Sequence, residues 1–176
     1  MNSKPNFTNS LLTITVVLVL AFAGLAHSAT NTVTSLADNG AGSLRQVIAD
    51  STAGDFIVFG VTGTITLASN ELVVAKNLTI IGPGTSALAI SGAGRSRIFN
   101  INSNVTALIS SVTVTNGGLG ATASGPGAPG GGICNYGVLW VSNCVIAGNS
   151  SGSGGTNYGD AGGGPGEAFI TAAHLG

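Results

Sequence analysis

The sequence predicts an all-β protein, a parallel β-helix solenoid of about four to five coils behind a short amino-terminal capping helix. Three observations predict this fold. From Phe56 onward, apolar residues recur at every second position in short runs that Gly, Asn or Pro interrupt. Similar stretches begin at Asn77, Ser111 and Asn143, which are 34 and 32 residues apart. Only 6% of the residues are charged and 29 of the 176 are glycine, which suits thin apolar layers joined by tight corners.

Residues 1–28 are predicted to be a cleaved signal peptide. Lys4 precedes an uncharged apolar run from Leu11 to Ala26, and Ala26 and Ser28 supply small residues at positions −3 and −1 of a cleavage site. The alternative is a retained membrane anchor, but the run is shorter than the about 20 residues of a spanning helix. The mature chain is therefore expected to be secreted or held at the cell surface, with no membrane span.

The mature chain carries little charge. Without Lys4 it has four basic and six acidic residues, a net charge of −2. Such a chain has no electrostatic footprint for nucleic acid or for an anionic membrane surface, and neither is expected as a partner.

A short helix is predicted near residues 43–50. Ser43 and Gln46 have the spacing of a capping box, in which Ser43 accepts from an early amide and the Gln46 side chain reaches back to the cap. Because the helix stands before the first coil, we expect it to cover that end of the solenoid, where strand edges would otherwise be unpaired. The apolar face that would do so is made of Leu44, Val47 and Ile48.

Residues 29–151 are predicted to form the coils. A β-sandwich would also have many short strands, but the similarity of NLTIIGPG, SVTVTNGG and NCVIAGNS favours stacked repeats. The expected inward pairs are Ile57/Phe59, Ile65/Leu67, Leu72/Val74, Leu78/Ile80, Leu88/Ile90, Val112/Val114, Leu139/Val141 and Cys144/Ile146. Superposing the three stretches predicts the ladders Ile80–Val114–Ile146 and Leu78–Val112–Cys144, with Leu108–Ser110 beneath Trp140–Ser142.

The last segment, residues 152–176, breaks the pattern. Gly162–Gly164 repeats the start of Gly130–Ile133, but Pro165 stands where the isoleucine would be. This Gly-rich tail is expected to be disordered, or the truncated start of further coils. The open last coil is then expected to associate with other chains or with downstream coils of a longer one.

Several stretches resemble a known family: NGAGSLRQVIADSTAGDFIVF, GTITL, ELVVAKNLTIIGPG, AISGAG, VTVTNG, and the coil GGGI-N-GVL-V-NC-I-GNS. They are similar to the amino-terminal region of large bacterial secreted proteins with a right-handed parallel β-helix of the pectate-lyase-like fold. The similarity covers about residues 30–164, and GSLRQ…GD is its most specific part. Gly130–Ile133 and Phe99–Asn102 also resemble the GGA[I/L/V] and FxxN motifs of chlamydial polymorphic outer-membrane adhesins, but Gly replaces Ala and each motif occurs once. The resemblance implies a right-handed solenoid on an exported protein and assigns no activity.

Polysaccharide cleavage, which this fold often hosts, requires carboxylates that converge on calcium or act as acid and base. The acidic candidates are Asp38, Asp50, Asp55, Glu71, Asp160 and Glu167, and the basic ones are Arg95 and Arg97. The expected outward positions hold Thr79, Thr113 and Val145, so we interpret the acids as solvated turn residues and the two arginines as surface charges. No catalytic, metal or cofactor-binding residue is assigned, and no cofactor is expected.

Histidine and cysteine chemistry is also limited. His27 lies at the cleavage site and His174 in the tail, so no Ser-His-Asp triad is available to the coils. Cys134 and Cys144 are ten residues apart, which is not metal-ligand spacing. Two interpretations stay open: Cys144 packs inward as a free thiol, or the two cysteines form the disulfide that export permits.

Two glycine patterns and two threonine pairs are interpreted as structural. GPGAPG (125–130) has no following helix, as dinucleotide binding requires, and GGLGAT (117–122) lacks the aspartate of a calcium-binding repeat. Thr64/Thr66 and Thr113/Thr115 are expected at unrelated coil positions, where they would form no flat ice-binding array.

These patterns predict a non-catalytic structural or adhesin-like domain at the cell surface. The alternative is a polysaccharide-binding or polysaccharide-lyase-type protein, of which this chain would be a fragment. A polysaccharide or a cell-surface protein would be the partner.

Overall fold

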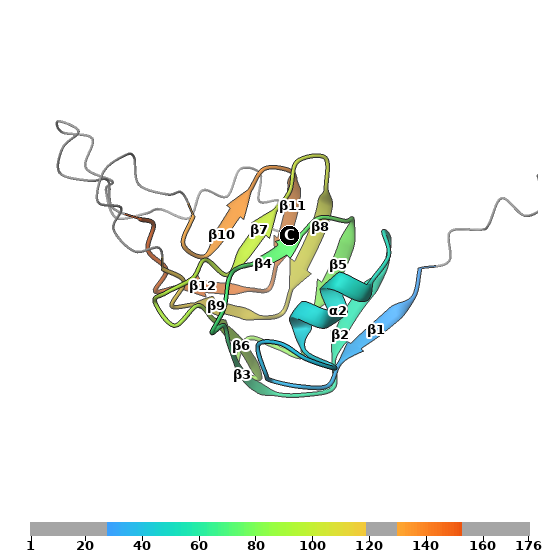
Figure 1. Ribbon diagram of the computed structural model, residues 1–176, viewed down its shortest axis with the longest axis horizontal. Helices are drawn as coiled ribbons and strands as arrows, with labels where there is room; N and C mark the ends of the chain where they lie inside the picture. The colour runs from blue at the N-terminus through green and yellow to red at the C-terminus, as the bar shows by residue number, and fades with distance from the viewer. Residues whose placement is uncertain (1–27, 119–129, 153–176) are drawn as a thin grey trace, which may run out of the picture.

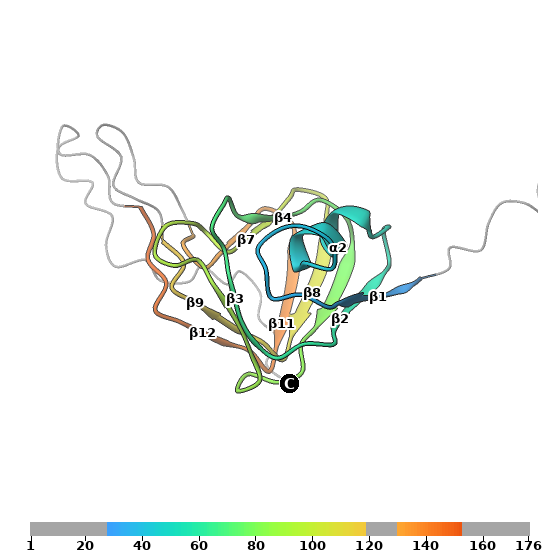
Figure 2. The same ribbon diagram turned by 60° about the horizontal axis from the view of Figure 1, so that its bottom comes forward.

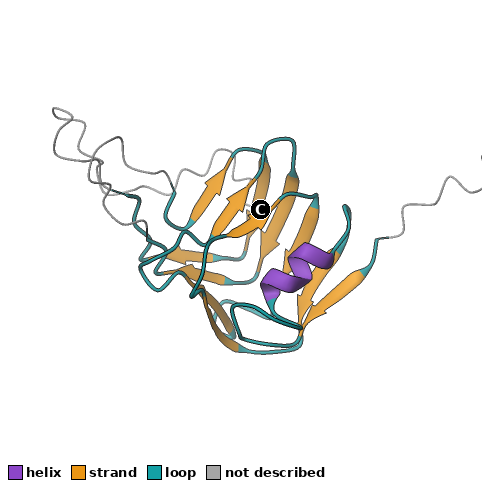
Figure 3. Ribbon diagram, viewed as in Figure 1, coloured by secondary structure: helices purple, strands orange, loops and turns teal. Residues whose placement is uncertain are grey.

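The computed structural model describes residues 28–118 and 130–152, and this part of the chain is mostly β-strand with one helix (Figures 1 and 3). The elements are β1 (Thr30–Val33), α2 (Leu44–Asp50), β2 (Phe56–Phe59), β3 (Gly63–Thr66), β4 (Leu72–Val74), β5 (Leu78–Ile81), β6 (Leu88–Ser91), β7 (Phe99–Ile101), β8 (Thr106–Ser110), β9 (Thr113–Thr115), β10 (Ile133–Asn135), β11 (Val138–Ser142) and β12 (Val145–Ala147). The predicted signal peptide and nearly all of the predicted tail lie outside the described residues.

The strands form three sheets, ordered β1-β2-β5-β8-β11, β3-β6-β9-β12 and β4-β7-β10. Every pairing between the strands is parallel. From β2 onward, sheet neighbours are three strands apart in the chain, so β2–β4, β5–β7 and β8–β10 are successive turns that each add one strand to every sheet. The fold is therefore an all-β, parallel, solenoid-like stack. A β-sandwich of antiparallel sheets, the alternative from the sequence, does not fit these pairings.

The core lies between the three sheets and consists of apolar columns that run along the stack. Ile57, Ile80 and Ile109 are in register in the first sheet and fully buried. In the second sheet, the column is Ile65, Ile90, Val114 and Ile146. Burial weakens in the last turn, where Ile146 is only partly buried. The carboxyl-terminal side of the stack is thus its least covered part among the described residues.

The structure corrects each of the two predicted ladders at its first position. Val114 does pair with Ile146, but the residue on its other side is Ile90, whereas Ile80 lies in a different sheet. Leu78 is in register with Ala107, so its place beside Val112 is wrong, whereas the register of β9 with β12 puts Cys144 opposite Val112 as predicted. The register of Leu108–Ser110 with Trp140–Ser142 is confirmed. Strands of different sheets share one sequence pattern: polar, apolar, any, apolar, turn. For this reason, the superposition of the three stretches matched β5 with β9 and β12, which belong to another sheet.

The predicted helix is present, and Ser43 is its cap. The Ser43 hydroxyl accepts from the Gln46 amide at 3.2 Å, which satisfies one free donor of the first turn. The other half of the capping box is wrong: the Gln46 side chain donates to Asp50 at 2.8 Å instead. Leu44 and Ile48 are buried, and α2 packs against β1 and β4. Figure 2 shows the helix at the amino-terminal end of the stack, next to these strands.

Among the described residues, no helix is long and apolar enough to cross a membrane.

Candidate functional site

A polar cluster forms on the three-stranded sheet, where residues from three turns meet. Glu71 directly precedes β4, and Asn100 is the central residue of β7. Asn100 is in register with Cys134 at the centre of β10, and Tyr136 follows that strand. Because a parallel stack places equivalent positions of successive turns side by side, residues far apart in sequence become neighbours here.

An ion pair holds this cluster together. Nη1 of Arg97 lies 2.7 Å from Oε2 of Glu71, and the amide of Asn100 donates to Oε1 of the same carboxylate at 2.6 Å. Nε of Arg97 also donates to the carbonyl of Gly130 at 2.9 Å. Only 8% of Arg97 is exposed, so its interpretation as a surface charge is wrong, whereas Arg95 is exposed as expected. The guanidinium connects three successive turns through one carboxylate and one carbonyl.

The cluster has one open acceptor and one exposed aromatic ring. Oδ1 of Asn100 is buried and has no hydrogen-bond partner within the described part of the chain. Tyr136 is 60% exposed, and a side-chain hydrogen bond with Cys134 raises the pKa of its hydroxyl. Val73, in register with Asn100, is also exposed. The exposed ring of Tyr136 can contact a ligand, whereas the buried Oδ1 of Asn100 is out of reach of solvent.

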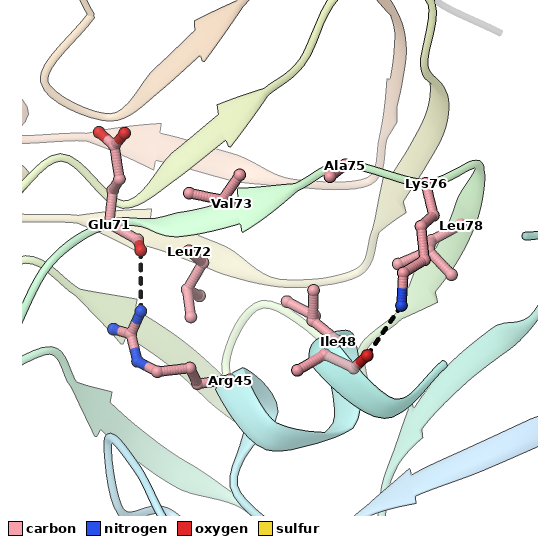
Figure 4. Close-up of a pocket in the computed structure, with 9 residues that line it drawn as sticks. Arg45, Ile48, Glu71, Leu72, Val73, Ala75, Lys76 and Leu78 are labelled. Atoms are coloured by element: carbon pink, nitrogen blue, oxygen red, sulfur yellow. Dashed lines mark hydrogen bonds between the residues drawn. The ribbon is translucent and has the colours of Figure 1, made fainter. Parts of the chain in front are cut away.

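A second feature is a cavity of about 320 Å³ between α2 and β4 (Figure 4). Its walls are mainly apolar, with Ile48, Leu72 and Leu78 among them, and a cation stands on either side. Arg45 donates to the carbonyl of Glu71 at 2.8 Å, and Lys76 donates to backbone carbonyls at the end of α2 at 2.7 and 2.6 Å. A cation at a helix carboxyl end also interacts favourably with the helix dipole. Both cations therefore attach the helix to the strand.

Asp38 connects the loop before α2 to the turn after β3. Oδ1 of Asp38 lies 2.7 Å from Arg45, and Oδ2 accepts from the amide and hydroxyl of Ser69 at 2.9 and 2.5 Å. Burial alone would raise the pKa of Asp38, but hydrogen bonds from Ser69 and Arg45 outweigh it and lower that pKa.

Asp55 has a similar position before β2. Its carboxylate accepts from the amides of Thr52 and Ala29, both at 2.8 Å, and from the Asn31 side chain at 3.0 Å. The Thr52 and Ala29 amides lower the pKa of Asp55 to about 2. Asp38 and Asp55 are only 8% and 3% exposed, so the interpretation of these two as solvated turn residues is wrong. Asp50 is exposed as expected, whereas Asp160, Glu167, His27 and His174 lie outside the described residues.

Both cysteines are free thiols. Cys134, not Cys144, is the buried one, although Cys144 was expected to be fully inward. Burial raises the pKa of the half-buried Cys144 thiol, whose sulfur lies 3.3 Å from the carbonyl of Ser142. A raised pKa keeps this thiol protonated and weakly nucleophilic near neutral pH.

The threonine pairs share a sheet, which corrects their expected placement at unrelated positions. Thr64 is in register with Ala89 and Ala89 with Thr113, so the two pairs stand two strands apart in one column. The strand between them carries Ala89 and Ser91 at these positions, and Thr113 uses its hydroxyl to donate to the carbonyl of Thr85 at 2.8 Å. The column is thus not a continuous threonine array.

The stretches Phe99–Asn102 and Gly130–Ile133 lie side by side, since Phe99 pairs with Ile133. Gly131 shows why this stretch is glycine-rich: a β-carbon there would lie 1.9 Å from the carbonyl oxygen of Ser150. Of the two glycine patterns, only Gly117, Gly118 and Gly130 are among the described residues, and the rest of GGLGAT and GPGAPG lies outside.

Within the described residues, no three His, Cys, Asp or Glu side chains lie close enough together to hold a metal ion. Comparison with protein-family models, curated proteins and solved structures gave no match to this chain. Its function is therefore inferred from the geometry of its own residues. The sequence offered no repeated signal for the cluster, because Glu71 precedes β4, whereas Asn100 and Cys134 are the central residues of β7 and β10.

Proposed function

We propose that this chain is an exported right-handed parallel β-helix domain that serves a structural or adhesin-like role at the cell surface, without catalysis. The observation that supports this role is that several charged side chains form ion pairs and hydrogen bonds between parts of the stack. Arg97 and Glu71 connect neighbouring turns, and Asp38 and Arg45 connect the amino-terminal loop and helix to the first turns. Charges held in such bridges stiffen a stack and are already committed to partners within it.

The domain would present a long repetitive surface. A solenoid grows by adding turns that contact only their neighbours, so its length can be extended without redesigning the core. The last turn carries the exposed side chains Tyr136, Val138, Trp140 and Val145, against which further turns or a second chain would pack.

Surface display tests this proposal. Full-length chain with a carboxyl-terminal epitope tag is expressed in an exporting bacterium, and intact cells are treated with an externally added protease. We expect the tag to be exported and accessible. Accumulation of the uncleaved chain in the cytoplasm would contradict export.

Polysaccharide binding is the second candidate function, and the exposed ring of Tyr136 on the three-stranded sheet's polar cluster favours it. Sugar hydroxyls donate hydrogen bonds, and sugar rings pack on aromatic faces. Purified mature chain is titrated with acidic polysaccharides, and release of unsaturated products is followed by absorbance. Binding that Tyr136→Ala abolishes would favour this candidate, and turnover that Glu71→Gln abolishes would contradict the non-catalytic role. Arg95→Met, at an exposed position outside the cluster, is the control.

A further inference from the structure

The backbone nitrogen of Ala29 lies at the entrance to the fold, next to a buried carboxylate. It donates to Oδ1 of Asp55 at 2.8 Å, and Asp55 is 3% exposed. The other oxygen, Oδ2, accepts from Thr52 and Asn31. The side chain of Thr52 also hydrogen-bonds the Asp55 carboxylate. These donors to the buried anion are all uncharged: two peptide amides, the Asn31 side-chain amide and the Thr52 hydroxyl.

The same nitrogen belongs to the bond at which cleavage of the signal peptide is expected. Ala26 and Ser28 occupy positions −3 and −1, so the peptide bond that would break is Ser28–Ala29. We propose that cleavage there delivers the new α-ammonium of Ala29 to Asp55, where it forms a terminal ion pair that fixes the mature fold. This inference rests on the proposed export.

The chemistry of this step is hydrolysis. Water adds across the Ser28–Ala29 bond, its oxygen bonds to the Ser28 carbonyl carbon, and the bond to the Ala29 nitrogen breaks. The leader leaves with a terminal carboxylate. The Ala29 nitrogen takes up the proton that the carboxyl group releases and is an ammonium at neutral pH.

The local structure holds this nitrogen in place from the other side. The Ala29 carbonyl accepts from the amide of Phe56 at 2.8 Å, and β1 begins at the next residue, with Thr30 in register with Phe56. The nitrogen therefore stays beside Asp55 once β1 has joined the sheet. Ser28 and Ala29 are themselves exposed, which leaves the bond between them accessible to a peptidase.

An ammonium changes the balance of charge at this site. The neutral donors already stabilise the Asp55 carboxylate, but a hydrogen bond between two charged groups is stronger than one from a neutral amide. The uncleaved chain can offer Asp55 only the neutral amide of Ala29. Cleavage would thus strengthen the attachment of β1, the edge strand beside α2, only in the processed protein.

Three forms of the chain distinguish the effect of the Ala29 charge from that of its hydrogen bond to Asp55. One begins at Ala29 with a free amine, the second begins at Ala29 with an acetylated amine, and the third begins at Ser28 and so moves the charge one residue away. We expect the free-amine form to melt about 4 °C above the other two. We also expect this difference to vanish in Asp55→Asn. Equal melting temperatures of the three forms would overturn the proposal.

A second readout does not depend on whether Asp55→Asn folds. The α-ammonium of Ala29 is titrated by NMR in the free-amine form, and its pKa is expected above the range of about 7.7–8.0 for an unperturbed terminus. A pKa within that range would contradict the ion pair.

The mature terminus of the exported protein completes the test. Mass spectrometry is expected to find Ala29 as the first residue. Export with cleavage at another bond would overturn this inference and leave the proposed function standing. Retention of the uncleaved chain in the cytoplasm would overturn both.

Discussion

Arg97 and Glu71 form an ion pair with an N–O distance of 2.7 Å across 26 residues of sequence. Each residue stands just before a strand of the three-stranded sheet, Glu71 before β4 and Arg97 before β7. The side chain of Arg97 is 10% exposed and that of Glu71 25%, so the pair is partly shielded from water. It therefore contributes more to stability than a fully exposed pair would.

Replacing Arg97 is expected to destabilise the protein more than replacing its neighbour Arg95. Arg97→Met leaves Glu71 without its cation and Gly130 without a donor, at a cost of about 2 kcal/mol, because partial exposure reduces the 3–5 kcal/mol typical of a fully buried pair. Arg95→Met, at an exposed position, is expected to change stability by less than about 0.5 kcal/mol. Urea unfolding measures both values. Equal effects would contradict a structural role for the ion pair.

The inward register predicts a strong contrast between adjacent residues of β9. Val114 is fully buried between Ile90 and Ile146, so Val114→Asp places an uncompensated charge in the column and is expected to cost several kcal/mol. Thr113→Asp should cost about 1 kcal/mol, for the lost hydrogen bond to Thr85. Thermal unfolding compares the two variants. A milder effect at Val114 than at Thr113 would mean that β9 is shifted by one residue.

Acid is expected to destabilise the amino-terminal part of the fold. The pKa of Asp55 falls from 3.8 to about 2 on folding, and that of Asp38 is also lowered. The unfolded chain therefore binds these protons at higher pH than the folded chain does. Their stabilisation is complete above about pH 5 and is lost as the pH falls toward 2. Asp55→Asn should flatten the dependence of the free energy of unfolding on pH in this window, as urea unfolding at several pH values would show.

The last turn is expected to mediate self-association. The described part has seven exposed large apolar residues, and Tyr136, Val138, Trp140 and Val145 all belong to this turn. A second copy is the expected occupant, because an antiparallel pairing of two β11 strands about Trp140 places Leu139 against Val141 and keeps their inward face. Since Trp140 is the only tryptophan, its fluorescence should shift with protein concentration.

Trp140→Lys should keep the chain monomeric in light scattering, whereas Ile81→Lys, at an exposed position of β5, should not. A wild-type chain that stays a cooperative monomer at high concentration would contradict association through this turn.

Local pattern was enough to predict the strands, the direction of most apolar side chains and the cap at Ser43. Alternation along a strand decides which residues are buried once one face is covered, as for Ile57, Ile65 and Val114. A Ser three residues before Gln46 caps a helix by contacts within one turn of chain. These features depend on interactions between residues close in sequence, so the sequence alone determined them.

Only the tertiary structure decided which strands pair and which charged side chains are buried. Strands of all three sheets share one short pattern, and turn lengths differ, so Ile80 could be matched with Val114 although its partner is Ile109. Whether Arg97, Asp38 and Asp55 are exposed to water or bonded to a neighbouring segment depends on which residues the stack places opposite them. A buried charge requires partners. Asp38 and Asp55 each have one nearby in sequence, Arg45 and Thr52, but those of their partners that connect turns stand 24 to 31 residues away, beyond the reach of local sequence pattern.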